Sequence, residues 1–598
     1  MGKDLMENLK EAGLEMQPYW SPRYLKNIDK LSKPIYKTKE EKDVCAPVRD
    51  GTRLCLDIFR PDAAGKKFPA LVAWSCYGKV EQSHRRDPVP ARGLLLDHSI
   101  EVPDIDFFTN RGYAFVIPDP RGVGKSEGEW YGMWNPQEQK DLHDIIEWVA
   151  QQPWCDGNVG MSGVSYFGAI QPLAAAQQPP HLKAIMPWPT FYDMYNFAYS
   201  GGIINDFFHY FILNNNPNNA VAESERLYSE EELKRKIQES LKDPYVDSNT
   251  FYVKILNTWP PRYNTWFLDI LLHQLDGPFW HSRSLKNLAD KIKIPAYFLG
   301  ENFLNAYTDP DLDIPKKAFD VGKYPFPSGH PCSYRYTQEE VLRWYDHWLK
   351  GIDTGIMDEP PIKLYVTGLN RYRYEYEWPL ARTEWTKLYL QQYKELATAL
   401  PHYQNKQPDA FTHNPLDLRT LDFDVPALTY STAPFSRPVE VTGPIALTLY
   451  AAIDVEDGNF IVSLLDISPD GSSTPVAGSA LRASHRALNK EKSQPWKPVH
   501  DHTKAVPVKS GEINEYAFSL LATHVFQPGH RLGLKIQAAA PSTPRYTSAT
   551  TIGLMPSPWV TAYRIFHDEE HPSHLLLPVI PETPEELWVE GTEFEPYM

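Results

Sequence analysis

A serine in the segment 163–168 has the local sequence expected of a nucleophile. The segment reads GVSYFG and lies between a short apolar run and an alanine-rich stretch, which predicts a strand, a tight turn and a helix. Such a turn exposes the hydroxyl of Ser165 beside the free N–H groups of a helix N-terminus, which suit a developing oxyanion. Phe167 replaces the second glycine of the pattern G-x-S-x-G, so the pattern alone also fits an ordinary turn with a capping serine.

The elements around this serine alternate between strands and helices. The runs FPALVAWSCYG, GYAFVIPDPRG and LKAIMPW are short, apolar and ended by glycine or proline, as buried strands are. Between them, Leu142, Ile145, Ile146 and Val149 follow the i, i+3, i+4, i+7 spacing of one helical face. This alternation predicts an α/β fold built on a parallel sheet.

The residue composition and the apolar pattern of the sequence change twice more along the chain. Residues 190–286 are rich in aromatic, Asn and charged residues and predict a helical cap inserted into the α/β part. The strand and helix pattern resumes over 287–355, and residues 356–598 alternate apolar and polar residues between Gly, Pro, Asp and Ser, as antiparallel β-domains do. We therefore expect an N-terminal extension (1–40), an α/β core in two parts (41–189 and 287–355), the cap, and a β-domain.

Composition and charge exclude several classes of function. The 598 residues include 60 Lys and Arg against 76 Asp and Glu, a net charge of −16, which argues against binding of nucleic acid. The five cysteines form no CxxC pair, so reduced thiols are expected rather than disulfides or a zinc site. No signal-peptide pattern, membrane-spanning run or complete phosphate-binding motif is found. We expect a cytoplasmic protein without a cofactor and without a membrane partner, and its oligomeric state stays open.

Several longer motifs carry a resemblance to a known family. They are IPDPRGVGKSEGEW, EQKDLHDIIEWVAQQPWCDGNVGMSGVSYFG, LKAIMPW, RWYDHWLKGIDTGIMDEPPIKLYVTG, LRASHRALNKEKSQPW and VFQPGHRLGLKI. In this order they resemble the cocaine-esterase and X-prolyl dipeptidyl aminopeptidase group of serine hydrolases, from about residue 44 to the C-terminus. The resemblance implies an α/β-hydrolase domain, an inserted helical cap and a C-terminal antiparallel β jelly-roll domain.

The resemblance also implies roles for individual residues. Ser165 matches the family's nucleophile, and the backbone N–H of Tyr166 with the hydroxyl of Tyr77 matches its oxyanion hole. His330 is the candidate general base, although it requires a longer loop than the family has. Phe303 stands where the family has its aspartate, so Glu301 is the first candidate for the acid of the triad. Asp309, from the same loop, is a second candidate.

Two enzymatic hypotheses and one non-enzymatic hypothesis follow. The first is a serine hydrolase that cleaves an ester or amide of a bulky apolar small molecule through an acyl-enzyme on Ser165. The second gives weight to Phe303: with an altered triad, the oxyanion hole and pocket would serve acyl transfer, or condensation or cyclisation of a carbonyl metabolite. The third is a degenerate relative that only binds a ligand or partner.

Overall fold

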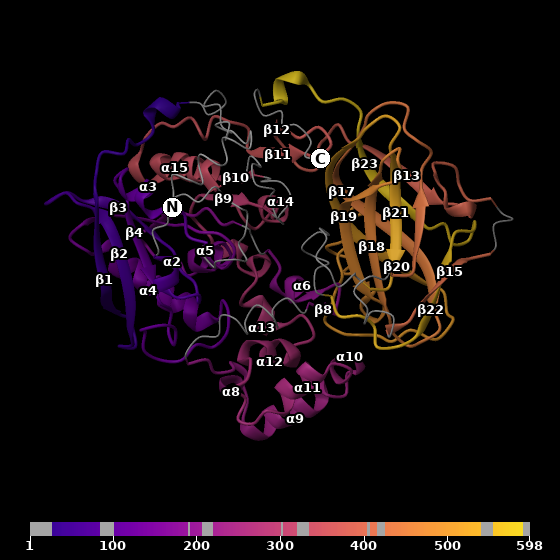
Figure 1. Cartoon of the computed structure of the whole chain (residues 1–598), viewed down its shortest axis with the longest axis horizontal. Helices are drawn as coiled ribbons and strands as arrows, with labels where there is room; N and C mark the ends of the chain where they lie inside the picture. The colour runs from indigo at the N-terminus through magenta and orange to yellow at the C-terminus, as the bar shows by residue number, and fades with distance from the viewer. Residues whose placement is uncertain are drawn as a thin grey trace, which may run out of the picture.

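The computed structural model describes residues 27–83, 101–188, 192–205, 219–300, 303–319, 334–402, 407–415, 425–539 and 554–589. Figure 1 shows an α/β part on the left, a helical part at the lower centre and a β part on the right. His330 and Glu301 lie outside the described residues. Across the described ranges, no helix is long and apolar enough to cross a membrane.

A twisted, mostly parallel sheet forms the centre of the α/β part. Its strands lie in the order β1 (Thr38–Pro47), β2 (Arg53–Pro61), β4 (Ala114–Pro118), β3 (Phe68–Val72), β5 (Cys155–Met161) and β6 (Leu182–Ala184). A parallel bridge from Ile185 to Ala296 continues the row into β9 (Ala296–Leu299), β10 (Lys316–Phe319), β11 (Ile362–Val366) and β12 (Arg371–Glu375). β1 and β2 at one edge and β12 at the other are antiparallel to their neighbours, and the strands between them are parallel.

Helices cover both faces of this sheet. Ala70 and Val72 of β3 face a core shared with α4 (Pro136–Ala150) and α5 (Tyr166–Ala176). Leu71, between them, faces the opposite core, with α3 (Ile105–Thr109) and α15 (Tyr334–Lys350). Successive side chains of a strand point to opposite faces of the sheet. Because every residue of β3 is buried, both faces of the sheet are covered at this strand. Two short helices, α2 (Lys79–Gln82) and α14 (Phe303–Tyr307), follow β3 and β9.

The helix predicted from the spacing of Leu142, Ile145, Ile146 and Val149 is α4, and all four side chains are buried. It begins where the sequence favours a helix start: the Asn135 side chain accepts hydrogen bonds from two backbone N–H groups of the first turn, and a proline follows at the first helical position. The structure therefore confirms the α/β pattern expected of this stretch.

The segment between β6 and β9 is mainly helical, as expected of the predicted cap. It contains α6 (Met194–Ala198), α8 (Ser224–Leu227), α9 (Glu230–Ser240), α10 (Pro244–Asp247), α11 (Thr250–Asn257), α12 (Thr265–Leu272) and α13 (Pro278–His281), a hairpin of β7 (Tyr199–Ser200) and β8 (Ile203–Ile204), and the 3₁₀ turns η3 (Leu285–Asn287) and η4 (Ala289–Lys291). Tyr195, Tyr199 and Trp280 are fully buried and pack their rings together. These aromatic side chains therefore belong to the interior of the helical part.

The C-terminal part consists of two facing antiparallel sheets around one apolar core. One sheet contains β14 (Leu396–Ala397), β13 (Glu384–Leu390), β23 (His574–Ile580), β17 (Val439–Ile453), β22 (Thr561–Phe566), β15 (Asp409–His413) and β20 (Asn514–Phe526). The other contains β16 (Ala427–Ser431), β21 (Arg531–Gln537), β18 (Asn459–Ile467) and β19 (Ser473–Arg482). The short 3₁₀ turns η5 (Gln392–Lys394), η7 (Ala483–His485) and η9 (Glu585–Leu587) lie in this part of the chain. A further 3₁₀ turn, η2 (Ile28–Lys30), precedes β1.

The first sheet continues into the residues that follow position 356. β11 and β12 lie beyond residue 356, yet β11 pairs with β10 in parallel and so extends the first sheet. Strand alternation alone does not reveal this, because an edge strand of a mixed sheet and a strand of a β-sandwich have the same period.

Candidate active site

The turn that carries Ser165 connects the end of β5 to the start of α5. Ser165 has φ 60° and ψ −115°, a backbone conformation that is uncommon for a residue with a side chain. Its N–H donates to the carbonyl oxygen of Trp188 at 2.6 Å, which ties the turn to the segment after β6. Backbone strain of this kind is typical of functional turns. Ser165 is half-buried and lies at the N-terminus of α5.

Two glycines make room for this turn. A Cβ on Gly163 would lie 2.5 Å from Cβ of Phe167, and a Cβ on Gly168 would lie 2.2 Å from the carbonyl oxygen of Trp188. Gly163 also has a positive φ of 128°. Gly168 thus provides the close approach expected of the second glycine in the short pattern, one position later in the sequence.

The structure brings three of the expected site residues together. Tyr77 follows β3, and its phenol lies near the hydroxyl of Ser165 and interacts with it. The ring of Tyr77 packs edge-on against that of Tyr166, with ring centres 5.6 Å apart. The backbone N–H of Tyr166 lies in the first turn of α5, where it has no partner within the helix. Ser165, Tyr77 and Tyr166 are therefore neighbours in the structure.

A fourth residue, Glu101, is part of this site although the sequence analysis did not single it out. Its carboxyl group lies near the hydroxyl of Ser165 and the backbone N–H of Tyr166 and interacts with both. The side chain is buried, and this burial raises its pKa from 4.5 to about 8. The oxygen Oε2 of this carboxyl has no hydrogen-bond partner within the described part of the chain. The flanking sequence, SIEVPD, gives only one signal for Glu101: a lone acid between two β-branched apolar residues.

A second buried glutamate supports Tyr166 from its other end. The phenol of Tyr166 donates to Oε1 of Glu138 at 2.6 Å, and the indole N–H of Trp74 donates to the same oxygen at 2.7 Å. Trp134 stacks on the ring of Tyr166, with centroids 4.8 Å apart. Burial raises the pKa of Glu138 to about 7. These contacts fix Tyr166 through both its backbone and its side chain.

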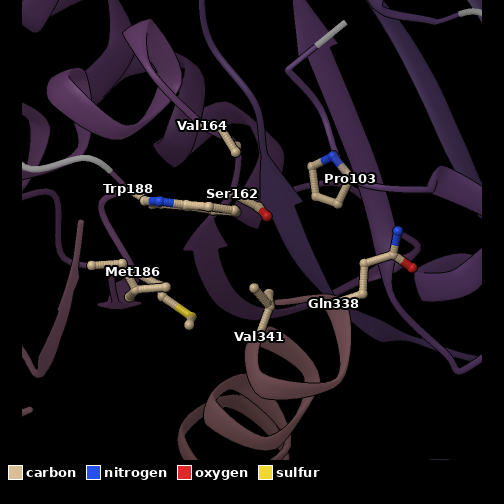
Figure 2. A pocket seen from close by; sticks show the side chains of 9 residues that line it. Pro103, Ser162, Val164, Met186, Trp188, Gln338 and Val341 are labelled. Carbon is tan, nitrogen blue, oxygen red and sulfur yellow. The ribbon is translucent and has the colours of Figure 1, made fainter. Parts of the chain in front are cut away.

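An apolar pocket lies directly beside the turn. It is lined by Pro103, Ser162, Gly163, Val164, Met186, Trp188, Leu299, Gln338 and Val341. The space between these residues is about 370 Å³, part of which is open to solvent. Figure 2 shows Trp188 and Met186 on one side, Pro103 and Gln338 on the other, and Val341 of α15 below. The lining has one neutral amide and one hydroxyl among otherwise apolar side chains and backbone, which suits an uncharged group of a ligand.

The other candidates for the triad are placed differently. Asp309 follows α14 and is buried; its Oδ2 accepts from the phenol of Tyr192 at 2.8 Å and its Oδ1 from the N–H of Asp311 at 2.9 Å. Both oxygens thus already have a partner within the helical part and its adjoining loop. Since the described residues do not include His330 and Glu301, the base and acid of the triad stay predictions.

The cysteines agree with the expectation of reduced thiols where the structure describes them. Cys45, Cys55, Cys76 and Cys155 are free, and Cys332 lies outside the described residues. Cys76, next to Tyr77, is buried, and its pKa is raised well above the usual value by burial.

Comparison with known proteins assigns this fold and site to a class. Residues 50–303 match the family model of the X-Pro dipeptidyl-peptidases (S15 family), and residues 354–576 match the model of the C-terminal non-catalytic domain of X-Pro dipeptidyl-peptidase. The chain is therefore an enzyme of the serine hydrolase class, and the ester or amide bond is the type of bond that such enzymes cleave.

The chain belongs to the S15 family, as the resemblance of its motifs indicates. It is 26% identical to cocaine esterase of Rhodococcus sp. (strain MB1 Bresler) over 90% of this chain and 98% of that protein. It is 25% identical to a putative serine esterase of Mycobacterium bovis, over 92% and 96% of the two chains. A crystal structure of a CocE/NonD family hydrolase from Staphylococcus aureus has the same fold, with a TM-score of 0.69 at 22% identity over 90% of this chain and 94% of that one.

Proposed function

We propose that the chain is an α/β-hydrolase with a helical cap and a C-terminal jelly-roll domain, and that it cleaves an ester or amide of a bulky apolar small molecule through an acyl-enzyme on Ser165. The observation that carries the proposal is the turn at Ser165: a strained serine at a helix N-terminus, with a phenol and a backbone N–H beside it. The strand order β1, β2, β4, β3, β5, β6 with β9 and β10 following supports the fold.

The proposed reaction proceeds in two steps. Oγ of Ser165 forms a bond to the substrate's carbonyl carbon, its proton passes to His330, and the bond to the leaving alcohol or amine breaks as that proton is returned to it. Water then attacks the acyl-enzyme by the same route and releases the acid. Tyr77 and the Tyr166 N–H stabilise the oxyanion in both steps. Glu301, or Asp309 in its place, would orient the imidazole.

The proposal for the substrate rests on the pocket beside the turn. Met186, Trp188, Leu299 and Val341 contribute apolar surface there, and the pocket's lining carries no charged side chain. An apolar acyl or aryl group gains binding free energy by leaving water in such a pocket, whereas a charged group loses its hydration. This favours an apolar ester over a charged peptide.

Labelling with a small fluorophosphonate tests the nucleophile. We expect one adduct, on the peptide that carries Ser165, and none in Ser165→Ala. A folded wild-type protein without an adduct, or with an adduct at another serine, would refute the assignment of Ser165.

Acyl transfer, or condensation or cyclisation of a carbonyl compound, is a second candidate that one observation favours. Glu101, a carboxyl group with a pKa of about 8, lies beside the proposed oxyanion donors. A group with that pKa is suited to exchange a proton with a carbon next to a carbonyl near neutral pH. Turnover in water labelled with heavy oxygen separates the two functions: hydrolysis places one labelled oxygen in the released acid, and transfer or cyclisation places none in its product.

A further inference from the structure

A side chain of the protein itself lies beside the proposed oxyanion hole. The carboxyl group of Glu101 interacts with the N–H of Tyr166, which the oxyanion needs, and with the hydroxyl of Ser165. A carboxyl oxygen and a substrate carbonyl oxygen are acceptors of the same kind. Glu101 therefore competes with the substrate for one donor, and the strength of this competition depends on its charge.

Two backbone hydrogen bonds hold Glu101 in position. Its backbone N–H donates to Oε1 of Gln82 at 3.0 Å, and its carbonyl oxygen accepts from the N–H of Val164 at 3.0 Å. Gln82 is buried in α2, and Val164 immediately precedes Ser165. The backbone of Glu101 is thus hydrogen-bonded to the turn that carries the nucleophile.

Among the residues that the structure describes, the titratable groups that interact with this carboxyl or lie behind it are neutral or acidic. Tyr77 and Cys76 come from the end of β3, Tyr166 comes from α5, and Glu138 of α4 lies behind Cys76 and Tyr166. Burial raises the pKa of both Cys76 and Tyr77, and the nearby Glu101 carboxyl adds a smaller contribution to each. Burial also raises the pKa of Glu101 itself, while its interactions with Ser165 and the Tyr166 N–H lower it by less.

We propose that Glu101 is a further catalytic residue, one that must carry a proton when the acyl group is transferred to Ser165. An ionised Glu101 holds the Tyr166 N–H by a charge-assisted hydrogen bond, which is about twice as strong as a neutral one. It would also place a second negative charge beside the oxyanion, and two anions that share a site disfavour each other. Protonation removes the charge, weakens the acceptor and frees the N–H for the oxyanion.

This inference rests on the proposed function and adds no step to its proton balance. The proton of Ser165 still goes to the base and then to the leaving group, while Glu101 keeps its own proton throughout. The expected consequence is a fall in acylation as the pH rises through about 8, where Glu101 ionises. Above that pH, the protonated fraction, and with it the acylation rate, falls about tenfold per pH unit.

The test measures the rate of fluorophosphonate labelling and kcat/KM for an aryl ester against pH in the full-length protein. The variant Glu101→Gln stays neutral at every pH, so we expect its acylation rate, whatever its level at neutral pH, to lose the alkaline fall. The matched control is Glu138→Gln: it removes a second buried acid near Tyr166, but one bonded to the phenol rather than to the N–H. We expect this control to keep the alkaline fall.

Each of the other outcomes contradicts either the role of Glu101 or the proposed function. An alkaline fall that persists in Glu101→Gln overturns the role of Glu101. Loss of acylation at every pH in folded Glu101→Gln, with activity kept in Glu101→Asp, overturns it in favour of a base. If Glu101→Gln does not fold, Glu101→Met carries the same expectation, since it also lacks the charge. No adduct on Ser165 at any pH, in wild type and variants alike, refutes the proposed function itself.

Discussion

Replacing Gly168 with alanine tests whether the packing around the turn sets the position of the nucleophile. The new Cβ would lie 2.2 Å from the carbonyl oxygen of Trp188, against 3.4 Å for an ordinary close contact, so the two segments must separate by about 1.2 Å. The same carbonyl oxygen accepts the N–H of Ser165. Because the obstructing atoms are backbone, no side-chain rotation relieves the clash.

A shift of about 1 Å in a catalytic group costs about 100-fold in rate, and overpacking a core costs about 1–3 kcal/mol in stability. We therefore expect Gly168→Ala to label with fluorophosphonate about 100-fold more slowly and to unfold at a lower urea concentration. Gly277→Ala is the control: nothing lies within 4 Å of its added Cβ, and its φ of −176° is open to any residue. Wild-type labelling and stability in Gly168→Ala would refute the assumption that this contact positions Ser165.

Two further substitutions test the oxyanion donor and the contact between parts of the molecule. Tyr77→Phe removes one proposed donor, so kcat for an aryl ester should fall by about 10²–10³ with little change in KM, and an unchanged kcat would exclude Tyr77 from the oxyanion hole. Arg482→Met leaves Asp243 and Asp457 without the guanidinium that joins them, so stability should fall by about 3–5 kcal/mol, measured by urea unfolding. The exposed Arg235→Met should cost less than about 1 kcal/mol, and equal effects of the two would show that burial of the pair does not matter.

Local pattern was sufficient to predict the elements that position Ser165. Helix α4 follows from a four-residue apolar spacing, and the turn follows from GVSYFG between a strand and an alanine-rich helix. The contact between Tyr77 and Ser165 required the family resemblance, because 88 positions separate 77 from 165 and no local pattern joins them. In the structure, the ring of Tyr77 packs against Tyr166, the residue after Ser165.

Glu101 could not be found from sequence because its role depends on its surroundings rather than on a motif. Its flanking residues have no periodicity that places the side chain against β5, and its raised pKa results from burial in the folded chain. The pairing of β11 with β10 has a related reason: the two strands meet across 42 intervening residues. In both cases the decisive contact is distant in sequence.

Tyr166 connects the two buried acids and explains why only one of them is expected to affect catalysis. Its N–H lies near Glu101 and its phenol donates to Glu138, while Trp134 stacks on the ring. The contacts on the phenol side fix α5, so the N–H points to one place whatever occupies it, which is the preorganisation an oxyanion hole needs. A change in the charge of Glu138 acts on this support from the far side of the ring. A change in the charge of Glu101 acts at the atom where the oxyanion forms, and the pH at which Glu101 ionises then limits the range over which Ser165 can be acylated.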